Sequence, residues 1–284
     1  MEYMLQKMIP NLLSTLSKKM NILNGYASLV KLPSNFSKNL PVSFLVLNKK
    51  NPVAYIKVPR NPSVNKTIEE EYNNLSKIYQ LIQKNESLKN SIPKPILYKD
   101  VENNLFLLIE TYFKGNKFYN TINFKEKKNL LNQAVNWLVK FHTLTQIKHL
   151  KIDASFFKKY ILPEIKYFLT NIAPNASFKS RLLNYLKEAK KFQNDTINIS
   201  AIHGDFNHYN ILKNKEKIKI IDWTDCSVEN IAVYDLIHFA FMMFLFSNKG
   251  NVQKLDLKNQ SLIDEYYTSY AKKMNINKEV ILFF

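Results

Sequence analysis

The first hundred residues of the chain alternate short apolar runs with clusters of turn-forming residues. Two of these runs, Val42–Asn48 and Pro52–Pro59, are joined through the turn sequence NKKN and predict an antiparallel hairpin. In the second run Lys57 shares a face with Val53 and Tyr55, so a single cation falls in an otherwise apolar strand. Such a lysine either reaches solvent at a sheet edge or has an anionic partner.

The segment that follows has a helical pattern and contains a candidate partner for this lysine. Thr67 with Glu70 three residues later matches the capping box, which predicts that a helix starts there. Glu71 falls in the apolar stripe of this helix, which is formed by Ile68, Leu75, Ile78 and Ile82. A single glutamate at the edge of a stripe usually reaches solvent, but the lysine in the preceding strand favours a buried ion pair between Lys57 and Glu71.

A second hairpin is predicted around Glu102–Asn104, and it leads into the apolar strand Leu105–Ile109. Beyond Gly115 the pattern becomes helical, and Asn123 with Glu126 repeats the capping signature. The apolar stripe of this helix comprises Leu130, Ala134, Trp137, Leu138 and Phe141.

Helical periodicity returns over Phe156–Leu169 and Leu182–Phe192. The whole pattern therefore predicts an α+β chain, with a strand-rich part containing one helix over residues 1–112 and a largely helical part over residues 113–284.

Composition narrows the class of protein. The 284-residue chain is 46% hydrophobic, which excludes general disorder, and its single cysteine, Cys226, favours a reducing compartment. The N-terminus does not have the pattern of a signal peptide. The longest apolar run, Ile231–Phe246, is too short to span a bilayer and contains Asp235 and His238. We expect a soluble cytoplasmic protein with no membrane span.

The net charge of +18 has two interpretations. It could attract nucleic acid, an anionic membrane surface or a phosphorylated ligand, or it could reflect lysines spread over solvated faces. The lysines are scattered and arginines are few, and no nucleic-acid recognition motif is present, so the second interpretation is favoured. No specific nucleic-acid partner is expected.

The stretch Ala201–Ser227 interrupts the helical part and gathers the polar residues with the clearest chemistry. Two short strands are predicted, around Asn210–Lys213 and Lys217–Trp223. A hairpin made from them would bring Asn210 and Asp222 to face each other across its mouth. One amide and one carboxylate suit Mg²⁺ held jointly with substrate phosphates. Asp205, just before the hairpin, could then accept a proton from an attacking hydroxyl.

The string HGDFNHYNILKNKEKIKIIDWTD resembles the signature of the aminoglycoside phosphotransferase family, which has the protein-kinase-like fold. Further motifs resemble those of the family in the same order along the chain: AYIKVPR, EEEYNNL, IPKPILY, LFLLIETYFKG, WLVKFH and VYDLIHF. The last of these, together with HGDF, is most similar to members associated with polysaccharide and glycan biosynthesis. The resemblance implies two lobes, a small antiparallel-sheet lobe over residues 1–112 and a larger, mainly helical lobe over residues 113–284.

The resemblance also implies roles for individual residues. Asp205 would be the catalytic base, and Asn210 and Asp222 would be the magnesium ligands. Lys57 would hold the nucleotide phosphates, with Glu71 fixing the lysine.

In addition, the backbone from Glu110 through Tyr112 to Phe113 would be the hinge that reads the adenine edge. Asp235 would brace the catalytic loop, and His203 would shape it. The remaining histidines are interpreted as structural or surface residues: His142, His149, His208 and His238.

The expected activity is transfer of the γ-phosphate from Mg·ATP, with GTP as an alternative nucleotide, to a hydroxyl of a sugar or glycan-related small molecule. The alternatives are a catalytically weak nucleotide-binding scaffold and a basic nucleic-acid-binding protein. Three features depart from the family pattern. No glycine-rich loop precedes the lysine strand, where LPSNFSKNLP would have to cover the phosphates. The string FNHY argues against an antibiotic acceptor, and the abrupt apolar end, KEVILFF, suggests that a final helix is missing.

Overall fold

The computed structural model describes residues 14, 27–33, 41–100, 104–117, 124–171, 175–214, 217–247 and 257–283. The chain forms two compact units. The first comprises Met1–Asn116 and Leu212–Thr224, and the second comprises Lys117–Ile211 and Asp225–Phe284. The first unit therefore includes Leu212–Thr224, a segment from late in the sequence. The predicted division at residue 112 placed this segment in the helical part. The proposed phosphate-covering residues 34–40, the capping residue Asn123 and most of the turn around Glu102–Asn104 lie outside the described residues.

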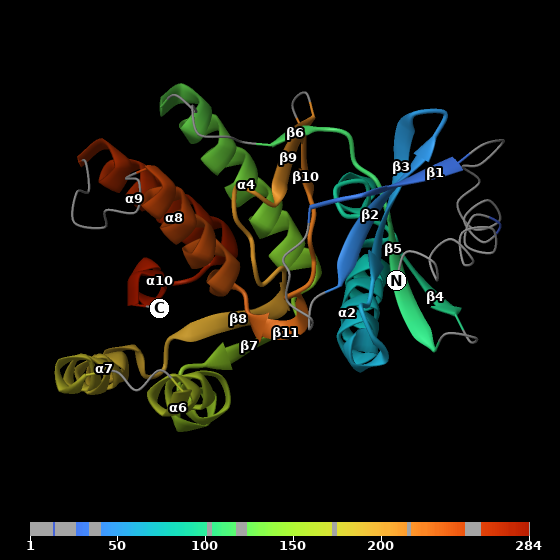
Figure 1. The fold of residues 1–284 in the computed structure, drawn as a ribbon. Coiled ribbons are helices and arrows are strands. Elements are labelled where there is room, and N and C mark those ends of the chain that lie inside the picture. Colours follow the sequence, from blue (N-terminus) through green and yellow to red (C-terminus); the bar gives the residue numbers. More distant parts are fainter. Residues whose placement is uncertain are drawn as a thin grey trace. The chain divides into compact units, whose positions relative to one another are not determined.

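The first unit is built on a five-stranded antiparallel sheet of order β1-β2-β3-β5-β4 (Figure 1). Its strands are β1 (Ala27–Lys31), β2 (Val42–Asn48), β3 (Asn51–Val58), β4 (Pro95–Asp100) and β5 (Leu105–Thr111). Both predicted hairpins are confirmed, since β2 pairs with β3 and β4 pairs with β5. The β2–β3 turn places Lys49 and Lys50 at φ 47° and 70°, which matches the twist of a two-residue hairpin.

The two faces of this sheet differ in chemistry. One face is an apolar cluster of Val42, Phe44, Val46, Ala54, Ile56, Val58, Ile96, Leu105, Leu107 and Ile109. On the opposite face of β3 and β5, Tyr55 pairs with Glu110 and Lys57 pairs with Leu108. Polar groups on this second face are therefore buried only where another element covers them and supplies partners.

Helix α2 (Asn65–Ile82) packs on β4 and β5. Its predicted apolar stripe is buried, and of the three consecutive glutamates only Glu71 is buried with it. The predicted start at Thr67 is wrong: the 3₁₀ turn η1 (Pro62–Val64) runs directly into the helix, and the N-cap Val64 makes no side-chain capping bond. Asn61 instead caps η1 by accepting a hydrogen bond from the Ser63 amide.

Short elements complete the first unit: α3 (Glu86–Lys89), β9 (Ile211–Asn214) and β10 (Lys217–Ile220). The strands β10 and β9, with β6 (Asn116–Lys117), form a three-stranded sheet in that order. The Ile220 amide donates to the Ser91 carbonyl at 2.8 Å, which fastens the end of β10 next to α3. This attachment fixes the starting point of the segment that contains Asp222.

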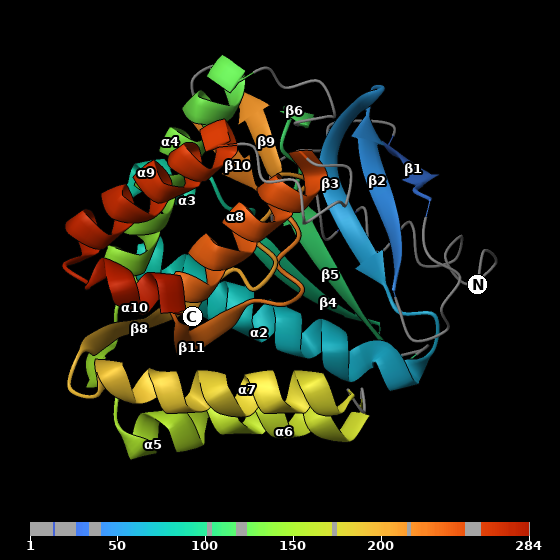
Figure 2. The ribbon, with the colours of Figure 1, turned by 90° about the vertical axis from the view of Figure 1, so that its left-hand side faces the viewer.

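The second unit is mainly helical. Its helical elements are α4 (Phe124–Leu144), α5 (Ala154–Phe156), the π-helical turn η2 (Phe157–Ile161), α6 (Leu162–Asn171), α7 (Ala176–Glu188), the 3₁₀ turn η3 (Ala189–Phe192), α8 (Val233–Ser247), α9 (Leu257–Met274) and α10 (Lys278–Phe283). A small antiparallel sheet of order β11-β8-β7 comprises β7 (Lys148–Lys151), β8 (Thr196–Ile202) and β11 (Ser227–Ile231). Helices α6 and α7 run side by side (Figure 2), with the rings of Phe168 and Phe178 5.2 Å apart.

The predicted apolar stripe of α4 is buried and meets α8 through the segment after β8. The ring of Phe206 lies 5.4 Å from Trp137 of α4 and 5.4 Å from Phe239 of α8. These observations confirm the α+β class. Within the described residues, no helix is both long enough and apolar enough to cross a membrane.

Candidate active site

The first unit contains a buried polar cluster around the lysine of β3. Lys57 Nζ lies 2.6 Å from Glu71 Oε1, and this distance confirms the predicted ion pair. The same ammonium lies 3.1 Å from Asp222 Oδ1 and donates to Thr224 Oγ1 at 2.7 Å. The side chains of Lys57 and Glu71 are only 6% and 1% exposed, so their charges face each other with little water between them.

Local structure brings Asp222 and Thr224 to the lysine. Asp222 follows β10 with φ 61°, a left-handed conformation that is uncommon for residues other than glycine. Trp223 is fully buried, and its indole N–H donates to the Ile220 carbonyl at 3.2 Å. Thr224 then donates to Asp222 Oδ1 at 2.8 Å. The buried indole thus holds a tight turn whose two polar side chains contact Lys57.

Electrostatics favour a charged lysine in this cluster. Burial lowers the pKa of Lys57, but the carboxylates of Glu71 and Asp222 outweigh that effect, and the pKa rises well above its ordinary value. Lys57 therefore carries its charge throughout the physiological pH range. A fixed ammonium in a buried site is the kind of group that holds nucleotide phosphates.

Glu110 lies inside β5, opposite Tyr55, so its side chain shares a face with Lys57. Its predicted role as hinge backbone stays a prediction. The residue is 4% exposed, and its Oε1 has no hydrogen-bond partner in the part of the chain that the structure describes. Burial raises the pKa of Glu110 to about 8, so the side chain is mostly protonated at neutral pH.

The two residues predicted to continue the hinge also make contacts. The Tyr112 amide donates to the Val53 carbonyl at 3.2 Å, which extends the pairing of β5 with β3 by one bond. The ring of Phe113 has Lys219 Nζ 4.7 Å from its centroid. The Tyr112 N–H is therefore occupied within the sheet, and the hinge role of Tyr112 and Phe113 stays a prediction.

The second unit contains the His-Gly-Asp loop, which follows β8. Asp235, in the first turn of α8, accepts hydrogen bonds from the amides of His203 at 2.7 Å and Gly204 at 2.9 Å. Gly204 has φ 84°, and a Cβ at this position would lie 2.1 Å from the Asp225 carbonyl oxygen. The loop therefore requires both this glycine and this buried carboxylate.

Three side chains hold the carboxylate of Asp205. Asp205 Oδ1 accepts from Asn207 Nδ2 at 2.7 Å and lies 3.0 Å from His238 Nε2, while Oδ2 accepts from Asn210 Nδ2 at 2.8 Å. Partial burial raises the pKa of Asp205, but the hydrogen bonds from His238 and Asn207 outweigh it, so the pKa falls below its ordinary value. An ionised carboxylate held in this way can accept a proton or orient a hydroxyl.

Two of these residues were missed at the sequence level. His238 was interpreted as structural or surface, but its ring contacts Asp205. The signal was present in VYDLIHF: Asp235 and His238 are three residues apart on one helix, so they lie on the same side. Asn207 belongs to the string FNHY, to which the sequence analysis gave no part in holding Asp205. Thr224, which binds Lys57 in the other unit, was also missed.

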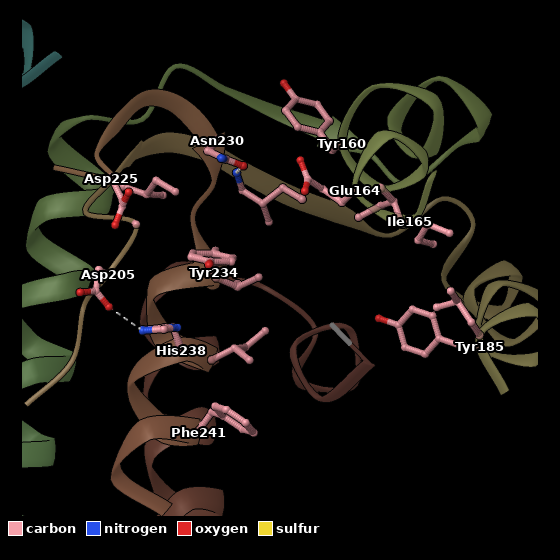
Figure 3. Close-up of a pocket in the computed structure, with 17 residues that line it drawn as sticks. Tyr160, Glu164, Ile165, Tyr185, Asp205, Asp225, Asn230, Tyr234, His238 and Phe241 are labelled. Atoms are coloured by element: carbon pink, nitrogen blue, oxygen red, sulfur yellow. Dashed lines mark hydrogen bonds and ion pairs between the residues drawn. The ribbon is translucent and has the colours of Figure 1, made fainter. Parts of the chain in front are cut away.

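A pocket of about 1010 Å³ opens beside Asp205 within the second unit (Figure 3). Asp205 and His238 form one side of it, and Glu164 and Tyr185 lie on the wall across from them. Among the described residues that line it, three are carboxylates and none is a lysine or arginine. In a chain of charge +18, this pocket is therefore locally acidic.

The residues proposed as magnesium ligands have suitable chemistry. Asn210 uses Nδ2 to donate to both the backbone oxygen and Oδ2 of Asp205, so its carbonyl oxygen is the atom left for a cation. Asp222, in the other unit, has a side chain that is 53% exposed. Among the described residues there is no cluster of three or more His, Cys, Asp or Glu side chains that could hold a metal. Mg²⁺ does not need one, because it is typically bound by one or two protein oxygens with substrate phosphates and water.

The protein has an antiparallel sheet with a lysine paired to a helix glutamate, and it has a His-Gly-Asp loop followed by an asparagine. Together these features define a kinase-like phosphotransferase. A family model described as the phosphotransferase enzyme family matches residues 42–270, and the chain belongs to this family. The predicted family, the kinase-like fold and the phosphotransferase class are thereby confirmed. The likeness to members involved in glycan biosynthesis stays a prediction.

Solved structures support the fold. A crystal structure of a putative aminoglycoside phosphotransferase from Ralstonia eutropha is 11% identical, with 93% of this chain and 80% of that chain covered and a TM-score of 0.64. An aminoglycoside phosphotransferase complex with GDP and kanamycin is 15% identical (96% and 97% covered, TM-score 0.52). A glucosamine kinase complex is 11% identical (88% and 70% covered, TM-score 0.54). No curated protein matches the chain in sequence.

Proposed function

We propose that the protein transfers the γ-phosphate of Mg·ATP to a hydroxyl group of a small molecule, with a sugar or glycan-related compound as the acceptor. The observation that carries this proposal is the carboxylate of Asp205, which is ionised, held by three side chains and located on the wall of a pocket of small-molecule size. GTP is the alternative nucleotide. A cytoplasmic location is part of the proposal, and it rests on the single cysteine.

Each residue has one task in the reaction. Lys57, fixed by Glu71, would hold the nucleotide phosphates, and Asp222 and Asn210 would be the ligands that hold Mg²⁺. The bound cation would neutralise charge on the phosphate oxygens. Asp205 orients the acceptor hydroxyl and takes its proton as the new oxygen–phosphorus bond forms and the bond to the departing nucleoside diphosphate breaks.

The pocket lining narrows the acceptor class. Glu164, Asp225 and Asp205 would repel an anionic acceptor such as a sugar phosphate, because no lysine or arginine offsets them among the lining residues that the structure describes. Tyrosine faces together with Asn230 suit a ring that carries several hydroxyls. The kanamycin and glucosamine complexes among the similar structures are compatible with a neutral or amine-bearing acceptor of this size.

An acceptor screen tests the proposal. Purified protein is supplied with Mg·ATP or Mg·GTP and a panel of sugars, amino sugars, aminoglycosides and choline, and nucleoside diphosphate release is measured. We expect acceptor-dependent release that is lost in Asp205→Asn. A protein that binds Mg·ATP but never turns it over with any acceptor would not support a phosphotransferase of this kind.

A nucleotide-binding scaffold is the second candidate, because the segment between β1 and β2 contains no glycine to cover the phosphates closely. Thermal shift with ATP, with and without Mg²⁺, separates the two functions. A magnesium-dependent rise in melting temperature supports the phosphotransferase, and a rise with ATP that does not depend on Mg²⁺ supports the nucleotide-binding scaffold.

A further inference from the structure

His238 belongs to α8, one turn after Tyr234, and it has a defined position beside Asp205 (Figure 3). Its Nε2 lies 3.0 Å from Asp205 Oδ1, and the side chain is 24% exposed. The rings of Tyr234 and His238 are stacked, with centroids 5.9 Å apart and planes 13° from parallel. Both residues line the pocket. The imidazole is therefore held from one side by a tyrosine ring and directed at the carboxylate.

A count of acceptor positions shows what this contact does. Each carboxylate oxygen can accept about two hydrogen bonds. Asn207 and His238 fill both positions on Oδ1, whereas Asn210 fills one position on Oδ2. Oδ2 therefore keeps one position for a hydroxyl. The Asp205 side chain is 39% exposed, and Asp205 lines the pocket.

The direction of the hydrogen bond follows from the charge. An ionised carboxylate only accepts hydrogen bonds, so Nε2 of His238 must carry the hydrogen and donate it. Without this donor, one acceptor position on Oδ1 would be open, and the carboxylate could rotate or bind a water molecule there. Either change would alter how the carboxylate is oriented toward the acceptor hydroxyl.

We propose that His238 is a positioning residue for phosphotransfer, which holds the carboxylate of Asp205 through Oδ1 in the orientation that meets the acceptor hydroxyl. The proposal rests on the proposed function, in which Asp205 is the base. His238 contacts neither the phosphates nor the proton in flight. The hydroxyl proton moves to the Asp205 carboxylate, the acceptor oxygen bonds to phosphorus, and the bond to the nucleoside diphosphate breaks.

The test compares His238→Ala, His238→Gln and Asp205→Asn with a control, His149→Ala, which changes an exposed histidine bonded only to Gln146 among the described contacts. Turnover of Mg·ATP is measured with water as the acceptor, and again with the best acceptor from the screen. We expect His238→Ala to lower kcat by about 100-fold, the size of loss that misplacement of a reacting group produces. The KM for ATP should change little, because His238 does not bind the nucleotide.

His238→Gln should recover most of the lost kcat, because its amide can donate to the same oxygen, and added imidazole should partly rescue His238→Ala. Melting temperatures check the fold, and if His238→Ala unfolds, the glutamine variant and a His238→Leu variant replace it. The proposal is overturned if His238→Ala matches His149→Ala, or if a folded His238→Gln is as slow as His238→Ala.

The two levels of proposal fail in different ways. If Asp205→Asn is inactive while His238→Ala is fully active, only the positioning role fails. If Asp205→Asn is fully active, or if the wild type turns over ATP with neither water nor any acceptor, the proposed function fails, and the role of His238 fails with it.

Discussion

Glu110→Gln tests whether the sheet of the first unit contains a carboxyl group that is protonated at neutral pH. Glu110 is 4% exposed, and the polar groups near it include two further carboxylates, those of Glu71 and Asp222. Burial raises its pKa from 4.5 to about 8 in the folded protein. In the unfolded chain the same side chain titrates near its ordinary value. Between these two pH values the folded protein retains a proton that the unfolded chain has released.

The sign of the effect follows from this difference in proton binding. The stability linked to Glu110 is fully present below about pH 4.5 and is lost as the pH rises through about 8. The gap between the two pKa values corresponds to at most about 5 kcal/mol of unfolding free energy. Glutamine has nearly the same shape and no charge, so Glu110→Gln should remove this loss and leave the packing of β5 unchanged.

Urea unfolding of the wild type and Glu110→Gln at several pH values between 5 and 9 measures the effect. We expect the variant to gain stability relative to the wild type as the pH rises, with the largest difference above pH 8. Glu70→Gln is the matched control, since that glutamate is on α2 with a 61% exposed side chain and should show no such trend. Parallel stability curves for the wild type and Glu110→Gln across this range would refute the reasoning.

Three further predictions concern the two polar clusters. Lys57→Met should abolish nucleotide turnover, and it should destabilise the fold by about 3–5 kcal/mol because the carboxylate of Glu71 then stays buried without its cation. The double variant with Glu71→Leu should recover stability in urea unfolding without recovering activity. Gly204→Ala should lose at least about 2 kcal/mol of stability and most of the activity, because the backbone has φ 84° and the new Cβ would meet the Asp225 carbonyl. A variant with the melting temperature and turnover of the wild type would contradict this prediction. Thr224→Val should raise the KM for ATP more than it lowers kcat, because it removes one hydrogen bond of about 1.5–3 kcal/mol to the Lys57 ammonium. Steady-state kinetics of the variant and the wild type measure both constants.

Local patterns in the sequence determined much of the first unit. The turn between β2 and β3 follows from adjacent turn-forming residues, and the period of α2 singled out Glu71 from two neighbouring glutamates. Lys57 and Glu71 lie in consecutive elements, only 14 residues apart, so a strand pattern and a helix pattern together were enough to pair them. The spacing of Asp205 and Asn210 is likewise a property of one short loop.

Other features depended on tertiary packing. Thr224 reaches Lys57 across 167 residues, and His238 reaches Asp205 across 33. Glu110 belongs to an apolar strand that is buried on both faces, so no alternation showed which side its carboxyl group would take. Only the register of β5 against β3 decided it.

The sequence by itself therefore determined which chemical groups are present and how neighbours within one turn, strand or helix are spaced, because backbone geometry fixes those distances. The tertiary structure alone decided which distant groups meet and which oxygen of Asp205 is left to accept a hydrogen bond, because these depend on how separate elements pack against one another.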